Sequence, residues 1–271
     1  MLTAGVVKFS YRSALILTLA SLVSAAGFVW PFFYAGQNLP RTQLFFAIAI
    51  TIAVVLTISE ISNSRMDAKS VALLGVLAAL VAALRPLGAG AVGIEPMWFL
   101  LILSARVFGP SFGFLLGLIS VFVSALLTGG VGPWLGYQIF AAAWIGLLAG
   151  ALPGRERLRG MREIALLMLF AVSASMLFGF LMDLQFWPWA LGANTQLSFL
   201  AGAPVAENLT RFITFHFLTA MAWDLPRAFF TAGLILITGQ SVLKALRRTY
   251  VRAAFLTPIE FIERGKAQRE V

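Results

Sequence analysis

Apolar residues run through most of this chain in long stretches, which are separated by short segments rich in glycine, proline and charged residues. About 20 consecutive apolar residues are enough for a helix to cross the hydrocarbon core of a bilayer. We read eight such spans at residues 13–34, 43–60, 69–84, 96–108, 110–128, 133–152, 164–183 and 223–246. The fourth is short, which fits either a sunken helix shielded by its neighbours or one arm of a re-entrant pair. The pattern therefore predicts an all-α membrane protein.

The segment 184–222 does not fit this simple alternation of span and loop. It contains a second apolar run, and we expect residues 205–222 to form a helix that lies over or dips into the outer face. A single helix through this run and the last span would have a length of about 60 Å, twice the hydrocarbon thickness. Because Pro226 disfavours a continuous helix, we expect the break near Trp223–Pro226 and the last span to start near Trp223.

Cationic residues indicate the orientation of the spans. With the N-terminus in the cytoplasm, only Arg41, Arg85, Arg211 and Arg227 of the 20 Lys and Arg residues fall on or near the outside. This bias matches the positive-inside rule, so we predict a multi-pass protein of the plasma membrane with both termini cytoplasmic. The basic inner surface is expected to face anionic membrane lipid and cytoplasmic partners.

Composition supports a membrane protein and excludes several other classes. Hydrophobic residues make up 60% of the 271 residues and charged residues only 11%, with a mean hydropathy of +0.92. The net charge of +9 would suggest nucleic acid in a soluble protein, but here we expect no nucleic-acid partner. The absence of cysteine and the presence of a single histidine, His216, argue against a disulfide framework and a metal centre. We find no credible nucleophile–base pair, so we expect no enzyme activity and no cofactor.

Glycine and alanine recur at helical spacing in two of the spans. In "FGPSFGFLLG", Gly109, Gly113 and Gly117 are four residues apart and share one helix face, which allows close packing of backbones. The third span carries a second face of small residues, formed by Ala72, Gly75, Ala79, Ala82 and Ala83. Ordinary internal packing would account for either face, and the second is also smooth enough to slide against a partner helix.

These motifs occur in an order that resembles a known family. An alanine-rich helix, a short helix, "FGPSFGFLLG", the turn "GGVGPW", a basic loop and "WDLPRAFFTAG" follow one another between residues 69 and 250. This order resembles the substrate-binding S-components of energy-coupling factor (ECF) vitamin transporters. The resemblance implies a six-helix core at 66–250, including an external loop and helix at 184–222. Two extra N-terminal helices at 1–65 and a basic cytoplasmic tail at 251–271 fall outside that core.

The resemblance also implies a function and partners. S-components bind a micronutrient in a pocket beneath external loops, and they deliver it together with a transmembrane coupling protein and two cytoplasmic ATPases. ATP hydrolysis would belong to those partners, and the sequence contains no G-x-x-x-x-G-K-[ST] motif of its own. The small face of the third span would dock the coupling protein. A stand-alone membrane carrier and a membrane assembly factor remain the alternatives.

Candidate substrate-binding residues are polar or aromatic groups near the outer ends of the spans. Asp224 and Arg227 are three residues apart on a helix and can pair, either beside a pocket or as a structural ion pair. Glu95 could bond a ligand or cap the short helix. The full set is Glu95, Trp98, Trp134, Tyr137, Gln138, Trp189, Asp224 and Arg227.

Trp98, Trp134 and Tyr137 come from different loops that would converge in this fold, where they could stack on a flat ligand, although an interfacial aromatic belt is the default interpretation. A ring-containing vitamin such as cobalamin is therefore the expected substrate. Two other polar residues have structural interpretations. His216 is expected to be a packing residue, and Arg106 is expected to extend to the cytoplasm.

Overall fold

The computed structural model describes residues 6, 7, 9–34, 48, 51, 67–88, 92–154, 157–191 and 195–253. Within these ranges the chain forms eight α-helices, two short 3₁₀ helices and no strand, which confirms the all-α prediction. The α-helices are α1 (Tyr11–Val29), α3 (Ala68–Leu84), α4 (Met97–Phe108), α5 (Pro110–Thr128), α6 (Leu135–Ala151), α7 (Met161–Ala190), α8 (Val205–Thr219) and α9 (Met221–Ala253). The 3₁₀ helices are η1 (Trp30–Phe32) and η2 (Pro86–Gly88).

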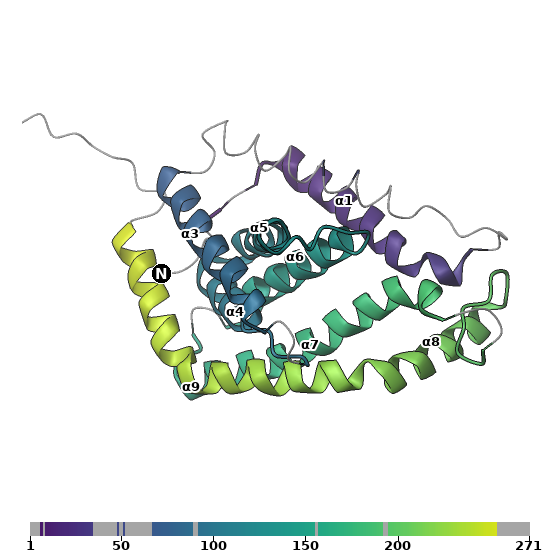
Figure 1. Ribbon diagram of the computed structural model, residues 1–271. Coiled ribbons are helices and arrows are strands. Elements are labelled where there is room, and N and C mark those ends of the chain that lie inside the picture. Colours follow the sequence, from purple (N-terminus) through teal and green to yellow (C-terminus); the bar gives the residue numbers. More distant parts are fainter. Residues whose placement is uncertain are drawn as a thin grey trace, which may run out of the picture.

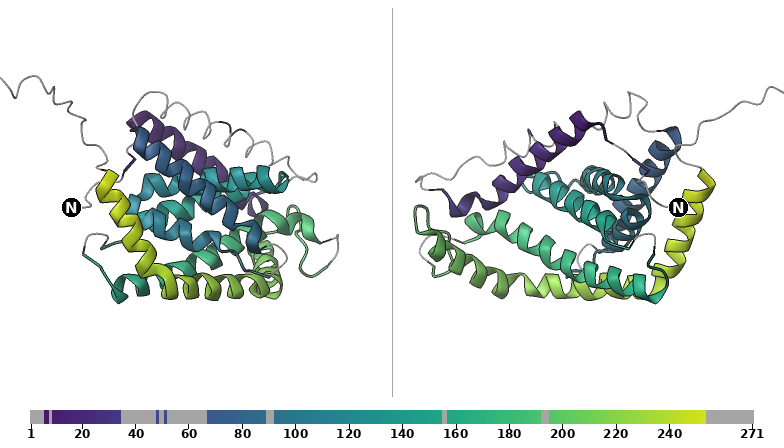
Figure 2. Two further views of the ribbon diagram at one scale, coloured as in Figure 1. Left: turned by 60° about the vertical axis from the view of Figure 1, so that its left-hand side comes forward. Right: turned by 180° about the vertical axis from the view of Figure 1, so that it is seen from behind.

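The helices form one bundle around a central group. α4, α5 and α6 lie in the middle, and α1, α3, α7 and α9 surround them (Figures 1 and 2). The bundle has two ends. One, which we call the basic end, holds the starts of α3, α5 and α7 and the ends of α4, α6 and α9. The other, which we call the α8 end, holds the opposite helix termini together with α8.

Among the described residues, five helical segments are long and apolar enough to cross a membrane: Tyr11–Phe32, Ala68–Gly88, Pro110–Thr128, Met161–Ala190 and Met221–Ala253. Two further apolar helices are shorter, α4 with 12 residues and α6 with 17. α4 rises only about 18 Å, and ten of its residues are buried among its neighbours, as the sunken-helix interpretation requires. The span expected at 43–60 lies almost entirely outside the described residues.

Glycines bring the backbones of α5 and α6 into direct contact. A Cβ built on Gly113 would lie 2.2 Å from the carbonyl oxygen of Gly146, and one built on Gly146 would lie 2.0 Å from that of Gly113. A Cβ on Gly117 would lie 2.3 Å from the carbonyl oxygen of Ala142, and one on Gly150 would lie 2.5 Å from the backbone of Gly109 and Pro110. The predicted glycine face of the fifth span is therefore a helix-packing face, and α6 supplies glycines of its own opposite it.

Two helix boundaries differ from those expected. α7 continues to Ala190, so the first part of the segment 184–222 extends this helix, with Pro188 in its last turn. The boundary between α8 and α9 falls at Ala220, and Pro226 lies inside α9 instead of ending a helix. Pro226 removes one backbone N–H near the start of a 33-residue helix, a small loss beside the bonds that remain.

Arg106 is buried and does not extend to solvent, so that prediction is wrong. Its side chain is 0% exposed and its Nε donates to Glu163 Oε1 at 3.0 Å. Its Nη1 donates to the carbonyl oxygens of Leu152 and Pro153 at 2.8 and 3.1 Å. Glu163 faces inward from the first turn of α7, and this buried carboxylate holds the guanidinium inside the bundle.

α1 and the residues that flank it contact the bundle near both ends of the helix. At the basic end, the backbone N–H of Val6 donates to the carbonyl oxygen of Phe108 at 3.0 Å. Toward the α8 end, the ring of Phe28 meets Tyr137 edge-on with centroids 5.0 Å apart, and Phe32 stacks on Trp187 at 6.1 Å. The first helix thus packs against the segment that the resemblance covers.

Candidate functional site

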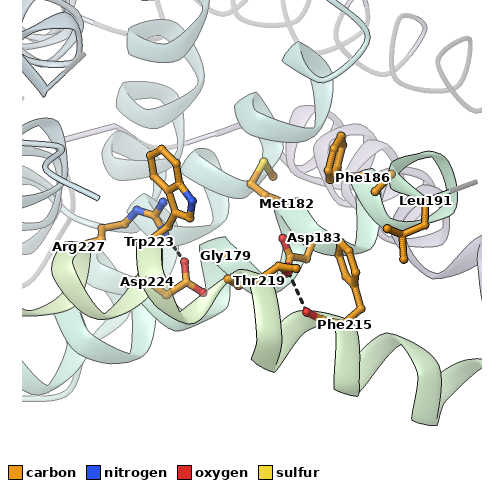
Figure 3. A pocket seen from close by; sticks show the side chains of 12 residues that line it. Gly179, Met182, Asp183, Phe186, Leu191, Phe215, Thr219, Trp223, Asp224 and Arg227 are labelled. Atoms are coloured by element: carbon orange, nitrogen blue, oxygen red, sulfur yellow. Dashed lines mark hydrogen bonds and ion pairs between the residues drawn. The ribbon is translucent and has the colours of Figure 1, made fainter. Parts of the chain in front are cut away.

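A cavity of about 450 Å³ opens at the α8 end of the bundle, between the last turns of α7, the end of α8 and the start of α9 (Figure 3). Its lining combines aromatic rings, two carboxylates and one guanidinium. The lining residues are Gly179, Met182, Asp183, Phe186, Ala190, Leu191, Phe215, Thr219, Ala220, Trp223, Asp224 and Arg227.

The sequence of α7 creates room for this arrangement at Gly179. A Cβ added there would lie 1.9 Å from Asp224 Oδ2 and 2.0 Å from Asp224 Oδ1, so only glycine lets the carboxylate approach α7 this closely. Residues 182, 183, 186 and 190 follow Gly179 at helical spacing and share its face, which is why one side of α7 forms a wall of the cavity.

Arg227 is the centre of a buried charged network beside the cavity. Its Nη1 donates to Asp224 Oδ1 at 2.6 Å, and its Nε lies 3.4 Å from Glu95 Oε2. Glu95 in turn accepts a hydrogen bond from the indole N–H of Trp98. The guanidinium also lies over the ring of Phe178, 5.1 Å from its centroid. The network thus joins the loop before α4, α7 and α9.

One oxygen of this network has no hydrogen-bond partner in the described part of the chain. Asp224 is 1% exposed, and its Oδ2 has no hydrogen-bond partner among the described residues. A buried carboxylate oxygen without a donor is costly, so such an atom next to a cavity favours a ligand that brings an N–H or O–H group.

A second polar pair borders the cavity. Asp183 Oδ2 lies 2.9 Å from His216 Nδ1, which links α7 to α8. The His216 ring is buried and contacts the rings of Phe180 and Phe212, with centroids 5.4 and 6.0 Å apart. His216 therefore has the packing environment expected for it, and it also orients a carboxylate that lines the cavity.

Four of the predicted binding residues come together and four lie elsewhere. Asp224 and Arg227 line the cavity, and Glu95 and Trp98 extend the same network. Gln138 instead accepts a hydrogen bond from Arg85 at 2.7 Å. The other three do not line this cavity either: Tyr137 is buried against Phe28, Trp134 is 45% exposed, and Trp189 is 44% exposed beside Trp30.

Several lining residues were not predicted, chiefly Gly179, Met182, Phe186, Phe215 and Thr219. They come from the last turns of α7 and the end of α8. A periodic signal was present, since the α7 residues recur at spacings of three and four. It was missed because the seventh span was ended at residue 183, before the pattern is complete.

The face of small residues on α3 is only partly exposed on the surface of the bundle. Ala72, Gly75, Ala79 and Ala83 are exposed, whereas Ala82 is 0% exposed. Ala82 packs inside the bundle and is therefore not part of a surface that a partner could touch. The exposed small residues, together with the neighbouring Val76 and Leu80, form a smooth strip along the helix.

Comparison with known proteins adds to this geometry. The profile of the family described as "ECF-type riboflavin transporter, S component" matches residues 65–221, more than half of the chain. Neither the curated proteins nor the solved structures contain a match to this chain. The matched region runs from just before α3 to the first residue of α9 and contains most of the helices that build the cavity. The chain thus belongs to the family of ECF-type riboflavin transporter S components.

Proposed function

We propose that this substrate-specific transport subunit binds a ring-containing vitamin, with riboflavin as the first candidate, in the cavity at the α8 end. A transmembrane coupling protein and two cytoplasmic ATPases would complete the importer. The observation that carries the proposal is the lining of this one cavity. It combines aromatic rings with an unpaired buried carboxylate oxygen and a guanidinium. The family's description names riboflavin, and this supports the choice of candidate.

The chemistry of the lining suits a flat heterocycle. Phe186, Phe215 and Trp223 offer ring faces for stacking, worth about 0.5–1.5 kcal/mol per pair beyond the area buried. Asp224 Oδ2 can accept from a ring N–H, and Arg227 can donate to a neighbouring carbonyl oxygen. Such an acceptor beside a donor matches the edge of an amide or imide ring.

The size of the cavity favours a tricyclic ring over a corrinoid. A volume of about 450 Å³ is in the range that encloses a drug-sized ligand. The macrocycle of cobalamin with its appended nucleotide is far larger than such a ligand. We therefore rank riboflavin above cobalamin as the substrate.

Replacing Asp224 by asparagine is expected to weaken riboflavin binding about 10- to 100-fold. The loss corresponds to one hydrogen bond to a charged group, about 1.5–3 kcal/mol. Quenching of flavin fluorescence, titrated with the purified chain in detergent, measures the dissociation constant directly. Phe186→Ala removes a ring that is 55% exposed, so it should leave the fold intact and weaken binding about tenfold.

Trp134→Ala provides the matched control, because Trp134 is also partly exposed but does not line the cavity. It should bind riboflavin as the parent chain does. If Asp224→Asn and Phe186→Ala both bind riboflavin with unchanged affinity, this cavity is not the flavin site. If the parent chain binds cobalamin but no flavin, the choice of substrate is wrong.

The exposed small strip on α3 is the proposed docking face for the coupling protein. Ala79→Trp is expected to reduce co-purification of the coupling protein at least tenfold while riboflavin binding by the isolated chain stays unchanged. A large ring there would hold the partner helix away from a surface on which close approach gives the contact energy. Pull-down of the coupling protein, normalised to the amount of this chain, measures the effect.

Ile237→Trp serves as the control for Ala79→Trp, since Ile237 is 80% exposed on α9, away from the strip. It should assemble normally. Equal co-purification with both tryptophan variants would remove the strip from the interface.

The bundle is proposed to sit with its basic end in the cytoplasm, which would place the cavity on the outer side. The described cations support this, because the basic end holds Lys69, Arg159, Arg162, Lys244 and Arg248, whereas the α8 end holds Arg85, Arg211 and Arg227.

A further inference from the structure

A second, cationic groove lies at the opposite end of the bundle from the cavity. It has a volume of about 190 Å³ and lies between the start of α7 and the second half of α9. Its lining residues are Arg159, Gly160, Glu163, Gln240, Leu243, Lys244 and Arg247. A shallower surface continues from it along α9, lined by Lys244, Arg247, Arg248, Val251 and Arg252.

Among the described residues, the groove holds more cations than carboxylates. Its one carboxylate, Glu163, already accepts from Arg106 at 3.0 Å and from Arg247 at 2.6 and 2.8 Å. α9 contains no Asp or Glu after Asp224. Lys244, Arg248 and Arg252 are exposed on the groove and its continuation, and within the described part of the chain no carboxylate pairs with them.

The second half of α9 lies across the basic end of the bundle. Figure 1 shows the helix running along one side and then turning along this end. There the ring of Tyr250 lies 6.2 Å from that of Phe108, and Lys69 Nζ donates to the carbonyl oxygen of Ala253 at 2.8 Å. Leu243 and Leu246 of this half of α9 are buried against the bundle. Lys244, Arg248 and Arg252, spaced four residues apart, therefore face outward in a single row, whereas Arg247 turns inward to Glu163.

This placement is that of an interfacial helix. Apolar residues face the bundle, cations face outward, and Val251 is 73% exposed among those cations. α7 also begins at this groove, and its N-cap Gly160 provides no side-chain cap for the first amides. Helix N-terminal amides favour anions, and they would add to the attraction of the cations.

We propose that this groove binds the phosphate headgroup of an anionic phospholipid. Apolar helices that cross the membrane bring the end of the bundle into the headgroup layer. Anionic phospholipids are therefore present around the groove at high local concentration. The phosphodiester would lie where the groove meets its continuation and contact Lys244 and Arg248, and the exposed Val251 would lie against the glycerol and upper acyl region. The acidic surface of a partner protein is the competing occupant.

The test uses the full-length chain in detergent with phosphatidylglycerol or phosphatidylcholine added, and native mass spectrometry counts the lipids that stay bound. Phosphatidylglycerol is expected to be retained in preference to phosphatidylcholine. The double variant Lys244→Gln/Arg248→Gln should weaken that retention about 25-fold, from roughly a fivefold loss per cation. Arg247 is left unchanged because it belongs to the buried network with Glu163.

The control variant removes the same number of positive charges from the same end of the bundle. Arg12→Gln/Arg162→Gln changes two exposed arginines that do not line the groove, and it should retain phosphatidylglycerol as the parent chain does. Equal retention of the two lipids, or equal loss in both double variants, overturns the proposal. Displacement of phosphatidylglycerol by millimolar inorganic phosphate would assign the groove to a free anion. Displacement by the coupling protein would assign it to a protein partner.

Discussion

Glu163→Gln is expected to destabilise the folded chain by about 3–5 kcal/mol. Glu163 is 1% exposed and is the only carboxylate within ion-pair distance of Arg106 and Arg247 among the described residues. Glutamine keeps the volume but removes the charge, so the guanidinium of Arg106 remains buried without a counter-ion. That uncompensated charge, more than the lost hydrogen bonds, accounts for the size of the effect. Unfolding of the purified chain in detergent, followed by helix content, measures it.

Glu207→Gln is the matched control for this prediction. Glu207 pairs with Arg211 one turn away on α8 at 3.0 Å, but its side chain is 45% exposed. An exposed pair of this kind contributes at most about 1 kcal/mol. If the two variants lose a similar amount of folding free energy, the burial of Glu163 does not account for its contribution to stability.

The helical fold could be predicted from the sequence because the residues of each helix indicate it locally. A run of apolar residues long enough for a membrane is sufficient to predict a helix, whatever it packs against. Pro110 and Gly109 mark the start of α5, and Asp67 caps α3 through its side chain, so these boundaries fall close to those expected. The glycine face was predicted for the same reason, since a spacing of four fixes which residues share a face.

Boundaries were missed where local signals conflict with tertiary contacts. The seventh span was read to end at residue 183, before "FWPW", yet the helix continues to Ala190. Trp187 there is fully buried, donates to the carbonyl oxygen of Leu197 at 2.7 Å and packs on Phe212. These partners lie well beyond Trp187 in the chain, so no local pattern reveals that they hold the helix end.

Only half of the candidate site could be predicted from the sequence, for a similar reason. The Asp224–Arg227 pair follows from helical spacing alone, and its distance of 2.6 Å confirms that interaction. Glu95 joins this ion pair only because of how the loop before α4 packs on α9. Gly93 in that loop adopts φ +68°. A Cβ on Gly93 would lie 2.3 Å from the carbonyl oxygen of Trp223. Contacts across 132 residues of chain have no counterpart in a linear pattern.

The face of small residues on α3 illustrates another limit. Spacing groups Gly75, Ala79 and Ala83 on one side and Ala78 and Ala82 on an adjacent side. It does not say which side turns outward. The packing of α3 against α4 and α5 decides this, and it buries Ala78 and Ala82. The exposed strip is therefore narrower than the sequence suggested.

Gly146→Ala is expected to destabilise the bundle by at least about 2 kcal/mol, the usual cost of overpacking a tight contact. The added methyl group would lie 2.0 Å from the carbonyl oxygen of Gly113, and backbone atoms cannot rotate away as a side chain can. α5 and α6 would have to separate, and the other close contacts along the same seam, at Gly117 and Gly150, would be lost with them.

Gly233→Ala on α9 separates this steric effect from helix propensity. Apart from its chain neighbours and the backbone of its own helix, no atom lies within 4 Å of a Cβ built on Gly233, so alanine there should stabilise the chain by up to about 1 kcal/mol. Both changes replace a helical glycine by alanine, and propensity alone predicts the same sign for both. Thermal unfolding in detergent should therefore move in opposite directions for the two variants, with a lower midpoint for Gly146→Ala and an unchanged or higher one for Gly233→Ala. A raised midpoint for both would show that α5 and α6 can move apart without cost, and direct backbone contact would not be what holds the centre of the bundle together.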